Sequence, residues 1–110
     1  MMGLIKTIVG IFAGPDNGYE AQRSQKWPAF RDQWLKSHNC CSACGRSDDL
    51  EVHHIVPFHL DQTLECEESN VITLCRDDHF TFGHLKDWKS WNPTVIKDCS
   101  SYLKKVRSRP

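Results

Sequence analysis

The sequence predicts a small α+β domain in which two short strands are flanked by helices. Its 110 residues suffice for one hydrophobic core and are too few for two. Two segments rich in β-branched residues, 50–56 and 71–74, are typical of an antiparallel strand pair joined by a loop. Apolar residues recur at helical spacing before and after this pair. We therefore expect the order helix, turn-rich segment, strand, loop, strand, helix.

The first residues form a separate apolar segment. Leu4, Ile5, Ile8, Val9 and Phe12 recur at helical spacing and predict a short amphipathic helix, which Gly14 to Gly18 would end. The segment is far shorter than the ~20 apolar residues of a membrane span, and Lys6 interrupts it. We expect residues 1–26 to be this helix and a polar linker, and 27–110 to be the main domain with a basic tail.

The main domain is expected to open with a helix. Pro28 suits the first turn of a helix, and Trp27, Phe30 and Trp34 share one side that should pack into the core. Residues 39–49 are turn-rich. After the strand pair, the carboxylate of Asp77 or Asp78 could cap a helix running through Phe80, Phe82, Leu85 and Trp88. A last helix is expected after Asn92 and Pro93, with Val95, Ile96, Tyr102 and Leu103 as its apolar residues.

The charges are unevenly distributed although the net charge is zero. From Ser47 to Cys75 there are seven acidic residues and no Lys or Arg. The rest of the chain therefore holds 14 basic and 7 acidic residues, a balance of +7. This pattern permits contact with nucleic acid, but an ordinary mixed surface would look the same.

Six cysteines in so short a chain suggest either disulfides or bound metal. A reducing cytoplasm is the expected setting, since no signal-like segment opens the chain, and clustered cysteines then favour metal. Cys41 and Cys44 form a CxxC pair, and Cys75 with Asp78 could complete a tetrahedral zinc site. Three alternatives stay open: a decayed site with a buried Cys75, replacement of Cys41 by Cys40, and a disulfide-linked secreted protein. Cys66 and Cys99 have no assigned role.

Four histidines fall in two groups, His53 with His54 and His79 with His84. Adjacent residues on a strand point to opposite faces, so one ring of the first pair can face the residues that follow the second strand. Neutral imidazole is the commonest nitrogen ligand of divalent transition metals. The two groups therefore predict a histidine metal site.

These segments together resemble the HNH endonuclease family, also called ββα-metal nucleases. The resemblance covers residues 41–84, about two-fifths of the chain, and it keeps the order and spacing of several elements. The matching motifs are Cys41-Ser42-Ala43-Cys44-Gly45, Leu50-Glu51-Val52-His53-His54-Ile55-Val56-Pro57, Asn70-Val71-Ile72-Thr73-Leu74-Cys75 and Asp78-His79. The chain departs from the family at Asp78, where a fourth Cys is usual, and in the longer step from His79 to His84.

The resemblance implies a ββα-metal core with a zinc-knuckle-like CxxC element and assigns roles by position. His54 matches the general base, and Asn70 matches the residue that braces the loop between the strands and helps to orient that base. His53, His79 and, less closely, His84 match ligands of one catalytic ion. Cys41, Cys44, Cys75 and Asp78 match a structural zinc site.

The activity implied is hydrolysis of DNA with one divalent ion, Mg²⁺, Mn²⁺, Ni²⁺, Co²⁺ or Zn²⁺, to give 5′-phosphate and 3′-hydroxyl ends. Nothing looks like a base-reading element, so a nicking or weakly specific nuclease is favoured. Residues 79–93 resemble a subgroup of phage and bacterial HNH proteins, which points to DNA packaging or processing, with packaging proteins as partners, in a host cytoplasm. His59, Arg76, Lys86, Lys89 and the basic tail could contact phosphates. The alternative is a zinc-stabilised module that binds DNA or protein without cutting.

Overall fold

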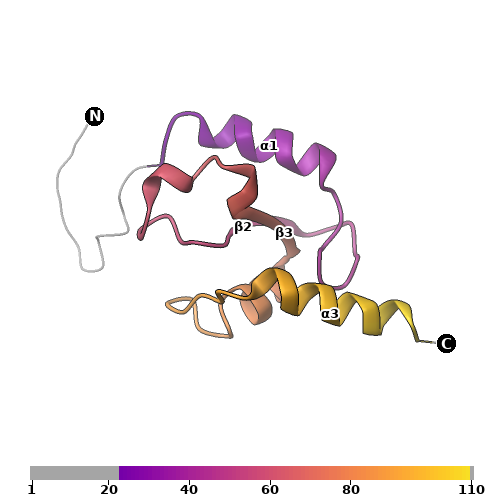
Figure 1. The fold of residues 1–110 in the computed structure, drawn as a ribbon. Helices are drawn as coiled ribbons and strands as arrows, with labels where there is room; N and C mark the ends of the chain where they lie inside the picture. Colours follow the sequence, from indigo (N-terminus) through magenta and orange to yellow (C-terminus); the bar gives the residue numbers. More distant parts are fainter. Residues whose placement is uncertain (1–22, 110) are drawn as a thin grey trace.

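The computed structural model of the chain describes residues 23–109. A two-stranded antiparallel sheet lies in the middle, with helix α1 on one side and helix α3 on the other (Figure 1). The longer elements are α1 (Trp27–Ser37), β2 (Leu50–His54), β3 (Val71–Cys75) and α3 (Val95–Arg107). The short ones are the 3-10 turns η2 (Gln62–Leu64) and η3 (Glu68–Asn70), the helical turn α2 (Arg76–Asp78) and the π-helical turn η4 (His79–Gly83).

The predicted strand pair is confirmed, with His53 opposite Ile72 and His54 opposite Val71. β2 ends at His54 rather than at Val56. The reason is Asn70: its carbonyl accepts from the amide of Ile55 at 2.8 Å, and its side-chain oxygen accepts from the amide of Val56 at 2.8 Å. Beyond His54, the side chain of Asn70 thus accepts the hydrogen bond that the backbone of a partner strand would otherwise accept.

The core is small and lies between β3, the turn-rich segment before β2, and the start of α3. Val95 and Cys99 of α3 are buried against it, whereas Ile96 is 56 % exposed. The helix after Asn92 and Pro93 is confirmed, but Ile96 is not on its buried face. The buried members of the core are Cys41, Ala43, Ile72, Leu74, Cys75, Val95 and Cys99.

The expectation of a long helix from Asp77 or Asp78 to Trp88 is wrong. Helical structure ends at Gly83, because Leu85 and Lys86 adopt left-handed φ angles of 56° and 65°, which a right-handed helix excludes. Neither aspartate caps the turn with its side chain. The carboxylate of Asp78 instead faces cysteine thiols, as described below.

Helix α1 begins at Trp27 with Pro28 in its first turn, as predicted. The expectation that Trp27, Phe30 and Trp34 lie in the core is wrong, since no residue of α1 is buried. The helix rests on the sheet through the indoles of Trp27 and Trp34, and Trp34 Nε1 donates to Thr73 Oγ1 at 2.9 Å. The predicted helix at Leu4 to Phe12 lies outside the described residues. Within residues 23–109, no helix combines the length and apolar character needed to cross a bilayer.

Candidate metal centre and catalytic cleft

Three histidines converge at the junction of β2 and the turn that follows β3. His53 comes from β2, and His79 and His84 stand at the start and just after the end of η4. Ligand atoms of the three rings all lie within 4.8 Å of one another. The amide of His84 donates to the carbonyl of His79 at 3.1 Å, the i to i+5 bond of a π-turn. This wider turn puts both rings on one side, and their Nε2 atoms are 3.2 Å apart.

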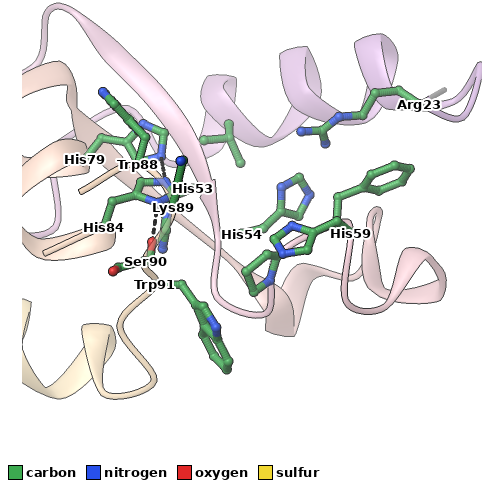
Figure 2. Close-up of a pocket in the computed structure, with 13 residues that line it drawn as sticks. Arg23, His53, His54, His59, His79, His84, Trp88, Lys89, Ser90 and Trp91 are labelled. Atoms are coloured by element: carbon green, nitrogen blue, oxygen red, sulfur yellow. Dashed lines mark hydrogen bonds between the residues drawn. The ribbon is translucent and has the colours of Figure 1, made fainter. Parts of the chain in front are cut away.

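Hydrogen bonds at Nδ1 fix the orientation of two of these rings. His79 Nδ1 is bonded to Glu51 Oε1 at 2.8 Å. His84 Nδ1 is bonded to the carbonyl oxygen of Ser90 at 2.8 Å (Figure 2). A carboxylate and a carbonyl only accept hydrogen bonds, so each Nδ1 carries the hydrogen and each Nε2 presents its lone pair. Two lone pairs at 3.2 Å repel each other unless a cation lies between them. A histidine backed by a carboxylate is the usual arrangement of a metal ligand.

His53 supplies an independent indication of a metal site. Its side chain is 1 % exposed, and its Nε2 is the one buried side-chain polar atom without a hydrogen-bond partner among residues 23–109. Burial, with the nearby His79 and His84, lowers the pKa of His53 to about 3, so the ring is neutral. Two nitrogens that share an ion at about 2.0–2.1 Å lie no more than about 4.2 Å apart, and the 3.2 Å between His79 and His84 fits that limit. An all-nitrogen set favours Mn²⁺, Co²⁺, Ni²⁺ or Zn²⁺ over Mg²⁺.

Two residues beside these histidines, Glu51 and Gly83, were not predicted from the sequence. Glu51 is two positions before His53, on the same face of β2, and that spacing was the available signal. Gly83 is buried against the His53 ring: a Cβ there would lie 2.9 Å from His53 Cε1 and Nδ1 and 3.1 Å from His79 Cδ2. The ring of His53 thus occupies space that any larger residue at position 83 would need.

His54 is directed to the other side of β2 and is 8 % exposed. Its Nε2 lies 2.9 Å from the carbonyl oxygen of Glu65, so Nε2 donates and Nδ1 is left without a hydrogen. The ring of Trp27 covers it at a centroid distance of 4.7 Å. Burial lowers the pKa of His54, and the bond to the Glu65 carbonyl opposes this in part. His54 is therefore neutral at neutral pH and able to accept a proton at Nδ1.

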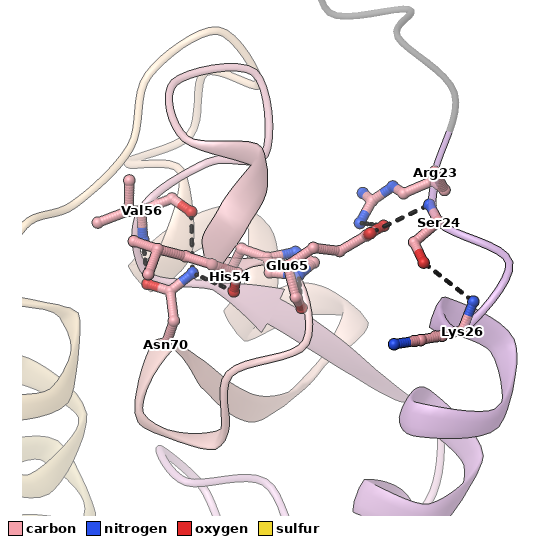
Figure 3. A network of polar contacts seen from close by, with 8 residues as sticks. Arg23, Ser24, Lys26, His54, Val56, Glu65 and Asn70 are labelled. Atoms are coloured by element: carbon pink, nitrogen blue, oxygen red, sulfur yellow. Dashed lines mark hydrogen bonds and ion pairs between the residues drawn. The ribbon is translucent and has the colours of Figure 1, made fainter.

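The carbonyl that holds His54 is itself fixed by a polar network (Figure 3). Asn70 Nδ2 donates to the carbonyls of Val56 and Leu64, each at 3.2 Å, and this ties the end of β2 to the loop that carries Glu65. The Glu65 carboxylate accepts from the amide of Ser24 at 3.1 Å and from Arg23 Nη1 at 3.5 Å. Asn70 thus braces the loop between the strands; its part in catalysis stays a prediction.

The three converging histidines and His54 line one cleft of about 950 Å³. Arg23, Lys89 and His59 also line it, and none of the described lining residues is Asp or Glu. Of the predicted phosphate contacts, Lys89 and His59 lie in the cleft. Arg76 instead pairs with Glu51 at 3.0 Å. The full lining is Arg23, Val52, His53, His54, Pro57, Phe58, His59, His79, His84, Trp88, Lys89, Ser90 and Trp91.

The predicted cysteine site also comes together. Ligand atoms of Cys41, Cys44, Cys75 and Asp78 lie within 4.8 Å of one another. The thiols of Cys41 and Cys75 donate to Asp78 Oδ2 at 3.2 and 3.3 Å, and burial raises the pKa of Cys44 to about 12. Three sulfurs and a carboxylate match the donors of a tetrahedral zinc site, and a cation there would offset the cost of forming thiolates.

The other cysteines do not join this cluster. Cys40 is exposed and bonds to its neighbour Asn39, so the expectation that it could replace Cys41 is wrong. All six cysteines are unpaired, which gives no support to the disulfide alternative. Cys99 lies in the core on α3.

Comparison with known proteins agrees with this arrangement. The family model described as HNH endonuclease matches residues 41–89. No curated protein and no solved structure matches the chain. The matched segment contains the cysteine cluster, both strands, Asn70 and all three converging histidines. With these elements folded into an α+β unit, residues 41–89 form an HNH endonuclease domain.

Proposed function

We propose that this protein is a metal-dependent endonuclease that hydrolyses phosphodiester bonds in DNA. One observation carries the proposal: a single cleft holds three converging histidines and, beside them, a neutral histidine whose Nδ1 can take a proton. The family match supports nuclease activity in general. Among the described lining residues of the cleft are two permanent cations, Arg23 and Lys89, and no carboxylate, which suits a phosphate backbone.

His53, His79 and His84 would hold one divalent ion. When bound, such an ion stabilises charge on the phosphate and on the leaving oxygen. His54 Nδ1 removes a proton from the water that attacks phosphorus, and the Glu65 carbonyl stabilises the imidazolium through Nε2–H. The new oxygen–phosphorus bond forms as the bond to the 3′-oxygen breaks, and the 3′-oxygen takes a proton from solvent water, which leaves 5′-phosphate and 3′-hydroxyl ends. Glu51, Ser90 and Asn70 position these groups and do not touch the substrate.

The choice of ion, the cysteine cluster, the sequence specificity and the biological role rest on different observations. The nitrogen donors favour Mn²⁺, Ni²⁺, Co²⁺ or Zn²⁺, while Mg²⁺ would be held less well. The cysteine cluster would hold a zinc ion that stabilises the fold. Weak sequence specificity follows from a cleft whose charged groups would contact phosphates rather than base edges. A role in phage DNA packaging or processing is supported only by the resemblance of residues 79–93.

The test is incubation of supercoiled plasmid with the protein and each of the five ions in turn. We expect the wild-type protein to yield nicked and then linear plasmid. His54→Ala should not cleave the plasmid, although its metal content and folding should be unchanged. His38→Ala is the matched control, since His38 is exposed and lies outside the cleft. A zinc-stabilised binding module would shift plasmid in a gel without nicking it. Cleavage by His54→Ala at the wild-type rate would exclude this residue as the base.

A further inference from the structure

We propose that the cleft is built for DNA that contains unpaired nucleotides, and that Trp88 is the platform on which an unstacked base next to the cleaved bond rests. The inference rests on the proposed nuclease function and names its substrate class. Its support comes from the position of Trp88, the loop that holds it and the charges around it.

Trp88 stands directly beside the metal centre. Its ring lies 4.8 Å from the ring of His84 and 5.4 Å from that of His79, measured between centroids, and it lines the cleft (Figure 2). Nevertheless 54 % of the residue is exposed. An exposed apolar residue alone needs no explanation. The ring of Phe80 also packs on this indole, at a centroid distance of 4.9 Å. An indole held by these three rings, with more than half of the residue still exposed beside the cleft, is suited to contact the substrate.

The loop that presents Trp88 is strained and firmly held. Leu85 and Lys86 are both left-handed, a conformation that is unfavourable for bulky side chains. The amide of Lys86 donates to the carbonyl of Phe80 at 2.9 Å, and that of Asp87 to the carbonyl of His84 at 3.0 Å. Ser90 of the same loop orients His84. Strain of this kind persists where contacts with the surrounding structure hold the backbone in place, and it is common at sites that clamp a ligand.

The surroundings of Trp88 fit a polyanionic strand. Trp88, Lys89 and Trp91 line the cleft together, an interleaving of aromatic and basic residues that is typical of single-strand binding. Across the cleft, the guanidinium of Arg23 lies between the rings of Trp27 and Phe58, 4.9 Å from each centroid. The cleft volume of about 950 Å³ is in the range of pockets that enclose drug-sized ligands, about 300–1,000 Å³.

The preference for unpaired DNA follows from where the phosphate must bind. The indole of Trp88 lies 5.4 Å from His79 and 4.8 Å from His84, so the nucleoside of a phosphate bound at these histidines would be within reach of the indole. In a duplex both faces of that base are stacked on its neighbours, so no face is open to the indole. In a single strand, a flap or a bulge a face is available, and stacking on an aromatic side chain increases affinity roughly 5- to 150-fold per base.

The test compares cleavage of one labelled sequence as a full duplex, as a single strand and as a duplex with unpaired nucleotides. We expect kcat/KM to be higher for the two unpaired forms by a factor in the range above. Trp88→Leu should lower cleavage of the two unpaired forms more than cleavage of the duplex and so remove most of this preference, whereas Trp88→Phe should keep most of it. Both substitutions leave an apolar group over the histidines, so a difference between them reports stacking. Ile96→Ala, an exposed apolar position on α3 outside the cleft, should behave as wild type.

A binding measurement separates this inference from the nuclease proposal. In a His54→Ala background, a single strand with 2-aminopurine should lose fluorescence on binding as its base stacks, and Trp88→Leu should abolish that loss. Metal titration of each variant checks that the histidine centre is intact. Quenching without cleavage of any substrate by the wild type would reject the nuclease and retain the stacking site. Equal cleavage of duplex and single strand, or unchanged quenching in Trp88→Leu, would overturn the inference.

Discussion

His79 and His84 face each other with their Nε2 atoms 3.2 Å apart although five positions separate them in the chain. In an α-helix, residues three and four apart share a face, and a fifth position would turn the second ring away. The π-turn of η4 supplies the wider turn. It absorbs the longer step between the two histidines and brings both to His53.

Glu51→Gln should weaken metal binding at the histidine centre by about 10- to 100-fold. The carboxylate fixes the orientation of His79 through a 2.8 Å bond, and an amide can present its NH₂ group instead. Isothermal titration with Mn²⁺ or Zn²⁺ measures the change. Arg76→Ala is the control, since it removes the other partner of Glu51 at a site that is 72 % exposed and should alter affinity little. Equal affinity in wild type and Glu51→Gln would show that Glu51 does not support the centre.

Gly83→Ala should displace His53 and lower both metal affinity and stability. The added Cβ would lie 2.9 Å from two atoms of the His53 ring, and overpacking of this kind costs about 1–3 kcal/mol of the free energy of unfolding. Urea denaturation and metal titration give the two readouts. Gly45→Ala is the matched control. The φ of +84° at Gly45 makes any other residue there unfavourable, but the atom nearest to the added Cβ is 3.8 Å away and lies outside the histidine centre. It should lose stability while binding the catalytic ion normally.

Asn70→Ala should destabilise the fold as well as reduce cleavage. It would leave the amide of Val56 and the carbonyls of Val56 and Leu64 without their partner, at a cost of about 1–3 kcal/mol for each buried group that water cannot reach. Asn70→Asp keeps an acceptor but sets a charge beside two carbonyl oxygens, so we expect no rescue. Thermal unfolding measures the loss, and Asn39→Ala, at an exposed position, is the control. A melting temperature like that of the wild type would refute the bracing role.

Asp78→Ala should weaken zinc binding at the cysteine cluster, and Asp78→Cys should restore or tighten it. The carboxylate lies within reach of the thiols of Cys41 and Cys75, and four thiolates are the commoner zinc set. Competition with a colorimetric chelator ranks the variants, and removal of zinc should lower the melting temperature because binding stabilises the folded state. Cys40→Ser should change nothing, as Cys40 is exposed and outside the cluster. Protein purified without added metal that contains no zinc would argue against the site.

The sequence by itself determined the strand pair, the helices before and after it, and the two groups of candidate metal ligands. These features depend on local signals: β-branched residues for the predicted strands 50–56 and 71–74, Pro28 for a helix start, and the spacing of Cys and His along the chain. The same signals misplaced the helix through Trp88. Leu85 and Lys86 are left-handed, and the amides of Lys86 and Asp87 bond to the carbonyls of Phe80 and His84, a turn that the apolar spacing does not encode.

Only the tertiary structure decided how the site is held. Glu51 reaches His79 from 28 positions away. Glu65 accepts from Ser24, 41 positions away, through its carboxylate and from His54 through its carbonyl. Such contacts depend on the register of β2 with β3 and on the path of the loop between them, which spacing along the chain does not encode. The packing of Gly83 against His53 has the same origin. The Cys and His residues along the chain specified which chemical groups are available for the candidate site. The fold decided which of their atoms face one another, because hydrogen bonds and ring contacts require positions fixed in three dimensions.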